Sequence, residues 1–282
     1  MTGLIDVGGG MRDIYGAGVI DQCLADGVKF DRVYGISAGS ANIMQYMSGQ
    51  MGRNFRFYAI YAFRPEYMSF KNFLREGSYI DLDYIYSALS DSDGEDPLDY
   101  DAVVRAGIPF TIVATDAETG KPAYFTQSDV SRDNYDAVKA SCCVPFFNKP
   151  YPFKDSAYFD GGMSDPIPVL RALRDGCDKV VVVLTRPKNF YRKDSMDLRI
   201  AFAMRKKYPN AAKAMAYRSR VYNRQLDLAK KYEKAGKVLI VAPDSIDSMS
   251  TLKKDRGAMV DLYHKGVNDG KAIRQFLGEG MI

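Results

Sequence analysis

Histidine is almost missing from this sequence, since His264 is the single one among 282 residues. Histidine is the usual base that activates a serine or cysteine nucleophile, so such chemistry here would need either His264 or another group as its base. Cysteine is also sparse. The absence of a CxxC pair argues against a zinc site or a thioredoxin-like motif and indicates buried free thiols in a reducing compartment. The four cysteines are Cys23, Cys142, Cys143 and Cys177.

Long apolar runs are absent as well. No stretch reaches the roughly 20 consecutive apolar residues that cross a bilayer. The N-terminus, MTGLIDVGGG, lacks the basic start and the sustained apolar stretch of a signal peptide. We therefore expect a cytoplasmic protein. No internal repeat or low-complexity linker divides the chain, which favours one domain over residues 1–282 and a sizeable core.

Positive charge is concentrated in one segment. Residues 186–237 contain sixteen Lys or Arg against four Asp or Glu, whereas the whole chain has a net charge of +4. Such a segment can attract the phosphates of a membrane surface or of nucleic acid, but charge runs more often form the solvated face of helices. We interpret it first as solvated helices and second as a peripheral contact with the anionic inner face of a membrane. Nucleic-acid binding is not expected, because none of its usual motifs occurs.

Strand-like and helix-like segments alternate along the chain. Buried strands are expected at 4–7, 32–36, 110–114, 180–184 and 238–242. Helices are expected at 17–24, 38–47, most of 187–236 with a break at Tyr208-Pro209, 252–263 and 273–277. Continuous apolar runs separated by helices predict an α/β fold, a three-layer α/β/α sandwich around a mostly parallel sheet.

An aromatic-rich region, residues 53–106, interrupts this alternation. We expect a helical insertion there, followed by a surface turn at the acidic run 91–96. Aromatic side chains at helical spacing are more often core than ligand pocket. Residues 53–75 are nevertheless a candidate for a cover that faces a substrate.

A serine sits in the stretch VYGISAGS, residues 33–40, between an expected strand and an expected helix. Gly35 and Gly39 lack a Cβ, so the chain can turn sharply and a helix can pack close behind Ser37. The helix that starts near Ala38 would supply backbone N–H groups beside the serine. The pattern is that of a nucleophile elbow.

A glycine run, Gly8-Gly9-Gly10, follows the first expected strand and precedes Arg12. Such a run lets backbone amides approach a substrate and stabilise an oxyanion. The rival interpretation is a dinucleotide-binding GxGxxG, but Asp13 stands at the third glycine position and the second strand ends in the serine turn. The oxyanion interpretation is favoured.

A carboxylate stands in Tyr158-Phe159-Asp160-Gly161-Gly162. By itself this stretch also fits a simple Asp-Gly turn.

The three motifs together resemble those of the patatin-like phospholipase family of bacterial type. That family combines a GGGxR loop, a GxSxG elbow and a DGG or DGA motif in this order. The motifs stand here as Gly8-Gly9-Gly10-Met11-Arg12, Gly35-Ile36-Ser37-Ala38-Gly39 and Asp160-Gly161-Gly162. The stretch ASCCVPFF at 140–147 is also similar to the family's segment ahead of DGG. The resemblance covers residues 3–185, and residues 186–282 add the basic helical segment, a last strand and helices. Asp13 departs from the pattern, since many relatives carry glycine there.

The resemblance implies a lipid acyl hydrolase of the phospholipase A or lysophospholipase type. Its substrate would be a lipid or acyl ester, and no metal or organic cofactor is implied. The implied roles are a nucleophile, Ser37; a general base, Asp160; oxyanion amides, Gly9 and Gly10; a supporting loop, Gly8 and Arg12; an elbow, Gly35 and Gly39; and a turn, Gly161 and Gly162.

A Ser–Asp dyad would need no histidine. A free aspartate has a pKa of about 3.9 and is a weak base at neutral pH, but burial beside Tyr158 and Phe159 would raise that pKa. Two alternatives remain. A soluble esterase or thioesterase could use His264 as base, since the order Ser37, Asp160, His264 matches an α/β-hydrolase triad. The chain could also be a catalytically silent lipid-binding protein.

Overall fold

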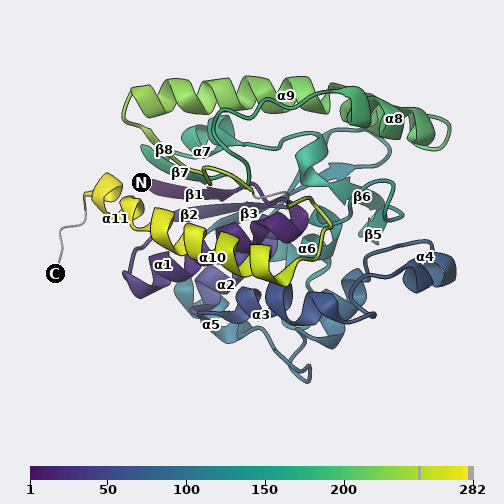
Figure 1. The fold of residues 1–282 in the computed structure, drawn as a ribbon, viewed down its shortest axis with the longest axis horizontal. Coiled ribbons are helices and arrows are strands. Elements are labelled where there is room, and N and C mark those ends of the chain that lie inside the picture. Colours follow the sequence, from purple (N-terminus) through teal and green to yellow (C-terminus); the bar gives the residue numbers. More distant parts are fainter. Residues whose placement is uncertain (247–248, 279–282) are drawn as a thin grey trace.

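The computed structural model describes residues 1–246 and 249–278, and these form an eight-stranded sheet between two layers of helices (Figure 1). The strands are β1 (Thr2–Asp6), β2 (Arg32–Ile36), β3 (Phe110–Asp116), β4 (Pro122–Phe125), β5 (Tyr151–Phe153), β6 (Ser156–Asp160), β7 (Lys179–Val183) and β8 (Val238–Val241). Their order is β5-β6-β3-β2-β1-β7-β8, with β4 paired to β3. Strands β3, β2, β1, β7 and β8 run parallel, and β4, β5 and β6 are antiparallel additions. The α/β fold with a mostly parallel sheet is therefore confirmed.

Helices cover both faces of the sheet. The layer drawn below it in Figure 1 contains α1 (Ile14–Ala25), α2 (Ala38–Ser48), α3 (Arg53–Ala59), α5 (Tyr100–Ala106), α6 (Asp136–Ser141) and α10 (Arg256–Gly270). The layer above it contains α7 (Val169–Arg174) and α9 (Pro209–Lys234). The remaining helices are α4 (Phe70–Glu76), α8 (Ser195–Met204) and α11 (Ala272–Leu277). Helices α4 and α8 both lie toward the end of the molecule where β5 and β6 lie (Figure 1).

The central strands are buried because each contributes side chains to both helical layers. Successive residues of a strand point to opposite faces of a sheet. Leu4 and Val181 accordingly join the core beneath α1 and α2. Ile5 and Val182 join the core beneath α7 and α9. Continuous apolar runs are therefore what this sheet requires, as expected for parallel strands covered on both sides.

Most expected elements are present, with several differences. Helices α6 and α7 were not expected. The strands β4, β5 and β6 were not expected, although β6 carries Asp160. Residues 187–194 are not helical, so α8 begins only at Ser195, and the expected break at Tyr208-Pro209 separates α8 from α9. Proline is favourable at the first helical position because its missing N–H has no partner there in any case.

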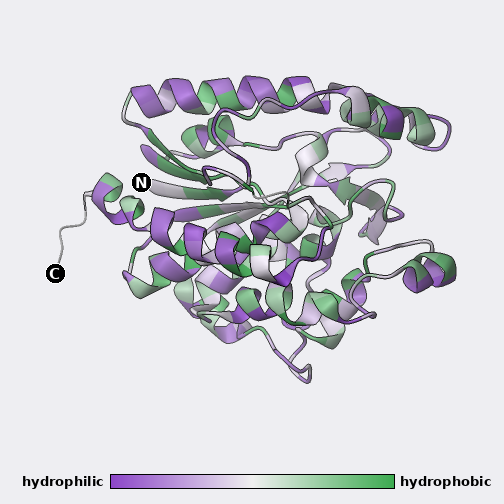
Figure 2. Ribbon diagram, viewed as in Figure 1, coloured by the Kyte–Doolittle hydropathy of each residue, from purple (hydrophilic) through white to green (hydrophobic). Residues whose placement is uncertain are grey.

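The basic segment forms amphipathic helices. Helix α9 buries residues such as Met215, Leu226 and Ala229, and hydrophilic and hydrophobic residues alternate along its ribbon in Figure 2. No helix within residues 1–246 and 249–278 combines the length and the apolar character needed to cross a membrane. Strand β8 pairs with β7 and α10 packs along α1, which supports our proposal that residues 1–282 form one domain.

Candidate active site

Ser37 lies at the sharp turn between β2 and α2. Its backbone has φ 56° and ψ −132°, a conformation that costs free energy for a residue with a Cβ and that concentrates at functional sites. Packing enforces the turn. A Cβ at Gly35 would come within 2.4 Å of the backbone of α2, and one at Gly39 within 2.4 Å of the Asp6 carbonyl oxygen. The amide of Ser37 donates to Ser141 Oγ at 2.8 Å, so α6 also holds the turn.

The glycine loop that follows β1 lies directly against this turn. Gly8 has φ +67°, and a Cβ there would lie 2.1 Å from the Ile36 carbonyl oxygen and 3.0 Å from Ser37 Cβ. Two hydrogen bonds fix the loop. Gly8 N–H donates to Asp6 Oδ1 at 3.1 Å, and Thr185 Oγ1 donates to the Gly8 oxygen at 2.6 Å. Two loops that follow neighbouring strands therefore meet at the carboxyl edge of the sheet.

The amides of Gly9 and Gly10 have no acceptor among the described residues, although the amides before and after them do. The next amide, Met11 N–H, donates to the Thr251 carbonyl oxygen at 2.8 Å. Backbone amides without a partner are what an oxyanion hole offers, so these two amides are candidates for that role.

Arg12 holds the same loop through its contact with Thr251. It is 5% exposed, and its Nη1 donates to Thr251 Oγ1 at 3.0 Å. Burial lowers the pKa of Arg12 to about 9, and the positive charges of Arg186 and Arg192 add to that effect. Arg12 and Thr251 together fix the course of the chain at Gly10.

Asp160 ends β6 and caps the short 3-10 helix η5 (Gly161–Met163). Its Oδ1 accepts from Gly162 N–H at 2.8 Å, and Arg218 Nε donates to the Gly162 oxygen at 2.8 Å. The carboxyl group is buried, which raises its pKa. The positive charge of Arg218, the hydroxyl of Ser37 and the Gly162 amide oppose that rise. Gly161 packs against β3, where a Cβ would lie 2.1 Å from the Val113 oxygen.

Two pockets meet at Ser37. One is mainly apolar and is lined by residues of the 53–106 region, among them Phe57, Tyr58, Tyr67, Ile80 and Leu82. The aromatic side chains expected to be core thus also form a pocket wall. The exposed aromatics of this region, Phe70 and Phe73, lie on α4 instead.

The second pocket contains Ser37 and Asp160 together with the glycine loop, and its wall is basic. Arg186, Arg192 and Arg218 line it. Sequence reasoning missed these three residues as members of the site, because their only signal was the positive charge of residues 186–237, which we interpreted as a solvated surface.

A family model described as "Patatin-like phospholipase" matches residues 7–173. The chain belongs to this family. A second family model, described as a domain of unknown function (DUF6363), matches residues 208–279. The patatin-like match covers all three motifs and ends before the basic segment.

Two named proteins are similar to this patatin-like chain. The uncharacterized protein YjjU of Escherichia coli (strain K12) is 32% identical over 194 residues, which are 67% of this chain and 53% of that protein. The chain therefore spans about half the length of this curated relative. Among solved structures, VipD from Legionella pneumophila matches with a TM-score of 0.49 at 13% identity, over 98% of this chain and 66% of that one.

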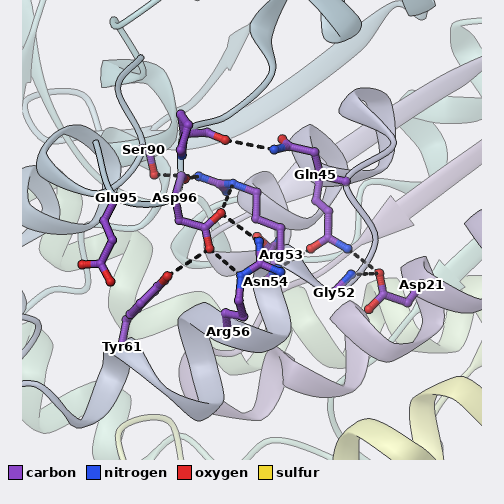
Figure 3. A network of polar contacts seen from close by, with 12 residues as sticks. Asp21, Gln45, Gly52, Arg53, Asn54, Arg56, Tyr61, Ser90, Glu95 and Asp96 are labelled. Atoms are coloured by element: carbon purple, nitrogen blue, oxygen red, sulfur yellow. Dashed lines mark hydrogen bonds and ion pairs between the residues drawn. The ribbon is translucent and has the colours of Figure 1, made fainter. Parts of the chain in front are cut away.

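A polar network supports the apolar wall of this patatin-like site (Figure 3). Arg53, which lines the apolar pocket, donates to Ser90 Oγ at 2.9 Å and to the Asp96 carbonyl oxygen at 2.8 Å. Arg56 pairs with both carboxylate oxygens of Asp96, at 2.6 and 2.9 Å. The network holds α3, which brings Phe57 to the pocket.

His264 lies away from this site. It is an exposed residue inside α10, six residues before the end of that helix at Gly270. It lines a separate surface groove with Asp244 and Lys265, and neither Ser37 nor Asp160 lines that groove. Ser37 and Asp160 therefore line one pocket, and His264 lines a different one.

Metal-binding clusters are not found in the part of the chain that the structure describes: no group of three or more His, Cys, Asp or Glu is placed to hold an ion. The four cysteines are buried, as expected, and none forms a disulfide bond.

Proposed function

We propose that this patatin-like protein is a serine acyl-ester hydrolase that acts on lipid esters, with Ser37 as nucleophile and Asp160 as general base. The observation that carries the proposal is that both residues line one pocket, where burial raises the pKa of Asp160 and the Ser37 hydroxyl opposes that rise. A hydroxyl next to a carboxylate of raised pKa has a base matched to its task.

The reaction would proceed in two halves. Ser37 Oγ attacks the ester carbonyl carbon while its proton passes to Asp160, and the negative oxygen of the tetrahedral intermediate accepts from the amides of Gly9 and Gly10. The intermediate collapses, and Asp160 returns the proton to the departing alcohol. Water then attacks the acyl-enzyme and gives a proton to Asp160. When this second intermediate collapses, Asp160 returns the proton to the departing Ser37 Oγ, which releases the carboxylic acid and regenerates the serine and the carboxylate.

The apolar pocket suits the acyl chain of such a substrate. Tyr58, Tyr67, Ile80 and Leu82 line it next to Ser37, so a hydrocarbon chain that enters would leave water and contact apolar side chains. Burial of each methylene group contributes about 0.8 kcal/mol, which favours long acyl chains over short ones.

Labelling with a fluorophosphonate probe, read by intact mass, tests the dyad. Wild type and His264→Ala should gain one adduct, whereas Ser37→Ala and Asp160→Asn should not. Circular dichroism checks that each variant is folded. A folded His264→Ala variant without an adduct would favour the esterase or thioesterase alternative. A folded wild type without an adduct would favour a catalytically silent lipid-binding protein.

We also propose that residues 186–237 contact an anionic membrane surface at the inner face of the membrane. Helix α8 exposes apolar side chains, of which Met196 and Phe202 are 58% and 66% exposed. Exposed Arg205, Lys206 and Lys207 follow directly. Apolar side chains on a short surface helix, with basic side chains directly after it, fit an anionic lipid interface.

Sedimentation with vesicles tests this contact. Binding to phosphatidylglycerol vesicles should weaken steeply as salt is raised and should fall in the Lys206→Gln/Lys207→Gln variant. A control, Lys231→Gln/Lys234→Gln, removes the same charge at the other end of α9. Equal loss in both variants, or binding that salt does not change, would contradict the proposed contact at α8.

A further inference from the structure

Ser37 lies where two pockets meet, one mainly apolar and one that also contains arginines. The apolar pocket is built mainly by α2, α3 and residues between Tyr67 and Tyr86. The basic pocket lies on the other side of the serine and is closed by the segment after β7 and by α9. An ester bound at Ser37 has two parts to accommodate, an acyl chain and an alcohol. If the acyl chain occupies the apolar pocket, the alcohol part faces the basic one.

The arginines of the basic pocket are close enough to influence one another. Burial lowers the pKa of Arg218 to about 10, and the charges of Arg192 and Arg186 contribute. Burial and the charge of Arg192 also lower the pKa of Arg186. Tyr222 lies among the same charges. Like charges brought together in a partly buried pocket repel one another, so an anion placed among them would be stabilised.

Among the described residues, two carboxylates, Asp160 and Asp197, line this pocket, fewer than its arginines. Asp197 pairs with Arg192 through two contacts of 2.8 Å and lies 3.8 Å from Arg218. Arg186 has no acidic partner within the described residues, and its guanidinium lies over the Phe190 ring at 4.2 Å. Arg12, behind the loop, has a buried Nε with no hydrogen-bond partner among those residues. The pocket beside Ser37 therefore carries an excess of positive charge.

We propose that Arg186, Arg192 and Arg218 bind a phosphate carried by the alcohol part of the substrate, so that acyl esters with an anionic phosphate headgroup are preferred. The inference rests on the proposed hydrolase function. Guanidinium groups bind phosphate oxygens through paired, charge-assisted hydrogen bonds. A neutral glycerol headgroup offers no such acceptor, and the ammonium group of a zwitterionic headgroup would meet the excess positive charge.

The test compares two lipids with the same acyl chain, lysophosphatidate and monoacylglycerol, in micelles of a neutral detergent at one ionic strength. Wild type should show a kcat/KM at least about tenfold higher for lysophosphatidate. Arg186→Gln should reduce this preference about tenfold, mainly through KM, as expected for the loss of one charge-assisted hydrogen bond. Arg186→Lys should keep part of the preference.

Arg220→Gln is the matched control. Arg220 is an exposed α9 residue outside the basic pocket, and its guanidinium lies over the Tyr217 ring at 5.3 Å. The substitution removes the same charge and the same kind of ring contact as Arg186→Gln. The lysophosphatidate preference should be unchanged, and a loss equal to that of Arg186→Gln would overturn the subsite in favour of a general surface-charge effect.

Two further probes separate the possible failures. p-Nitrophenyl butyrate carries no phosphate and reports the hydrolase activity alone. If wild type hydrolyses it but shows equal kcat/KM for the two lipids, the phosphate subsite is overturned and the hydrolase proposal stands. If wild type hydrolyses no ester, both proposals fall. Free glycerol 3-phosphate should inhibit competitively and glycerol should not. Inhibition by glycerol 3-phosphate without a lysophosphatidate preference would identify a small-anion site and overturn the proposed headgroup selectivity.

Discussion

The carboxylate of Asp96 holds α3 beside the apolar pocket, and its removal should destabilise the protein strongly. Asp96 is 7% exposed at its side chain and lies 3.6 Å from the guanidinium of Arg53, which is 5% exposed. Tyr61 also donates its hydroxyl to Asp96, at 3.2 Å. Asp96→Ala leaves Arg53 buried without its counter-charge, and breaking a buried pair in this way costs about 3–5 kcal/mol. Arg53 keeps its bonds to Ser90 and to the backbone at residue 96, so we expect a loss near the lower end, about 3 kcal/mol.

The neighbouring residue supplies the control. Glu95 also forms a paired contact with an arginine, Arg64, at 2.6 and 2.8 Å, but its side chain is 53% exposed. Exposed ion pairs contribute about 0–1 kcal/mol. Urea unfolding followed by circular dichroism gives both free energies, provided that the m-values agree. Equal losses for Asp96→Ala and Glu95→Ala would refute the argument that burial makes the difference.

Three other predictions concern the site. Burial raises the pKa of Asp160 and the charge of Arg218 lowers it. For a neutral soluble ester, the acid limb of the kcat/KM profile should therefore have an apparent pKa above that of an ordinary aspartate, and this pKa should rise further in Arg218→Gln. An apparent pKa that Arg218→Gln leaves unchanged would contradict Asp160 as base. Gly8→Ala places a Cβ 2.1 Å from a main-chain oxygen at φ +67° and should abolish fluorophosphonate labelling and cost about 1–3 kcal/mol; full labelling would argue against the oxyanion loop. Burial and the charge of Asp6 raise the pKa of Asp13 well above its usual value, so the stability that the protonated Asp13 contributes is lost as pH rises past about 4. Asp13→Asn should therefore be more stable than wild type in urea at pH 7 and no more stable at pH 3, and a gain of equal size at both would disprove it.

The local geometry of the glycine-containing motifs could be predicted from the sequence because it depends on nearby residues. Gly35 must be glycine because a Cβ there would meet the backbone of Ser40, and Gly39 because a Cβ there would meet Asp6 of the adjacent strand β1. Gly8 needs a positive φ, which glycine adopts most easily. The continuous apolar runs of β7 and β8 identify strands for a similar reason, since each residue of such a strand is covered from one side or the other.

The rest of the site depends on contacts between distant segments. Arg186 follows β7, Arg192 precedes α8 and Arg218 lies within α9, so only the fold shows that they line one pocket. Strand β6 was not expected because it is short and only partly buried before Phe159. An aromatic such as Tyr58 has the same pattern whether it packs in the core or lines a pocket, because both remove apolar surface from water.

A carboxylate can replace histidine as base only if its environment keeps it both basic and charged. Burial raises the pKa of Asp160, and a carboxyl group that kept its proton could not accept one from Ser37. Arg218 opposes this effect through its charge, while its Nε holds the Gly162 carbonyl and so the turn that carries Asp160. The same arginine lines the proposed phosphate subsite. A bound phosphate would weaken the field of Arg218 at Asp160 and raise the pKa of that carboxyl. Under the proposed mechanism, occupation of the basic pocket therefore makes Asp160 a stronger base at the moment when a substrate is present.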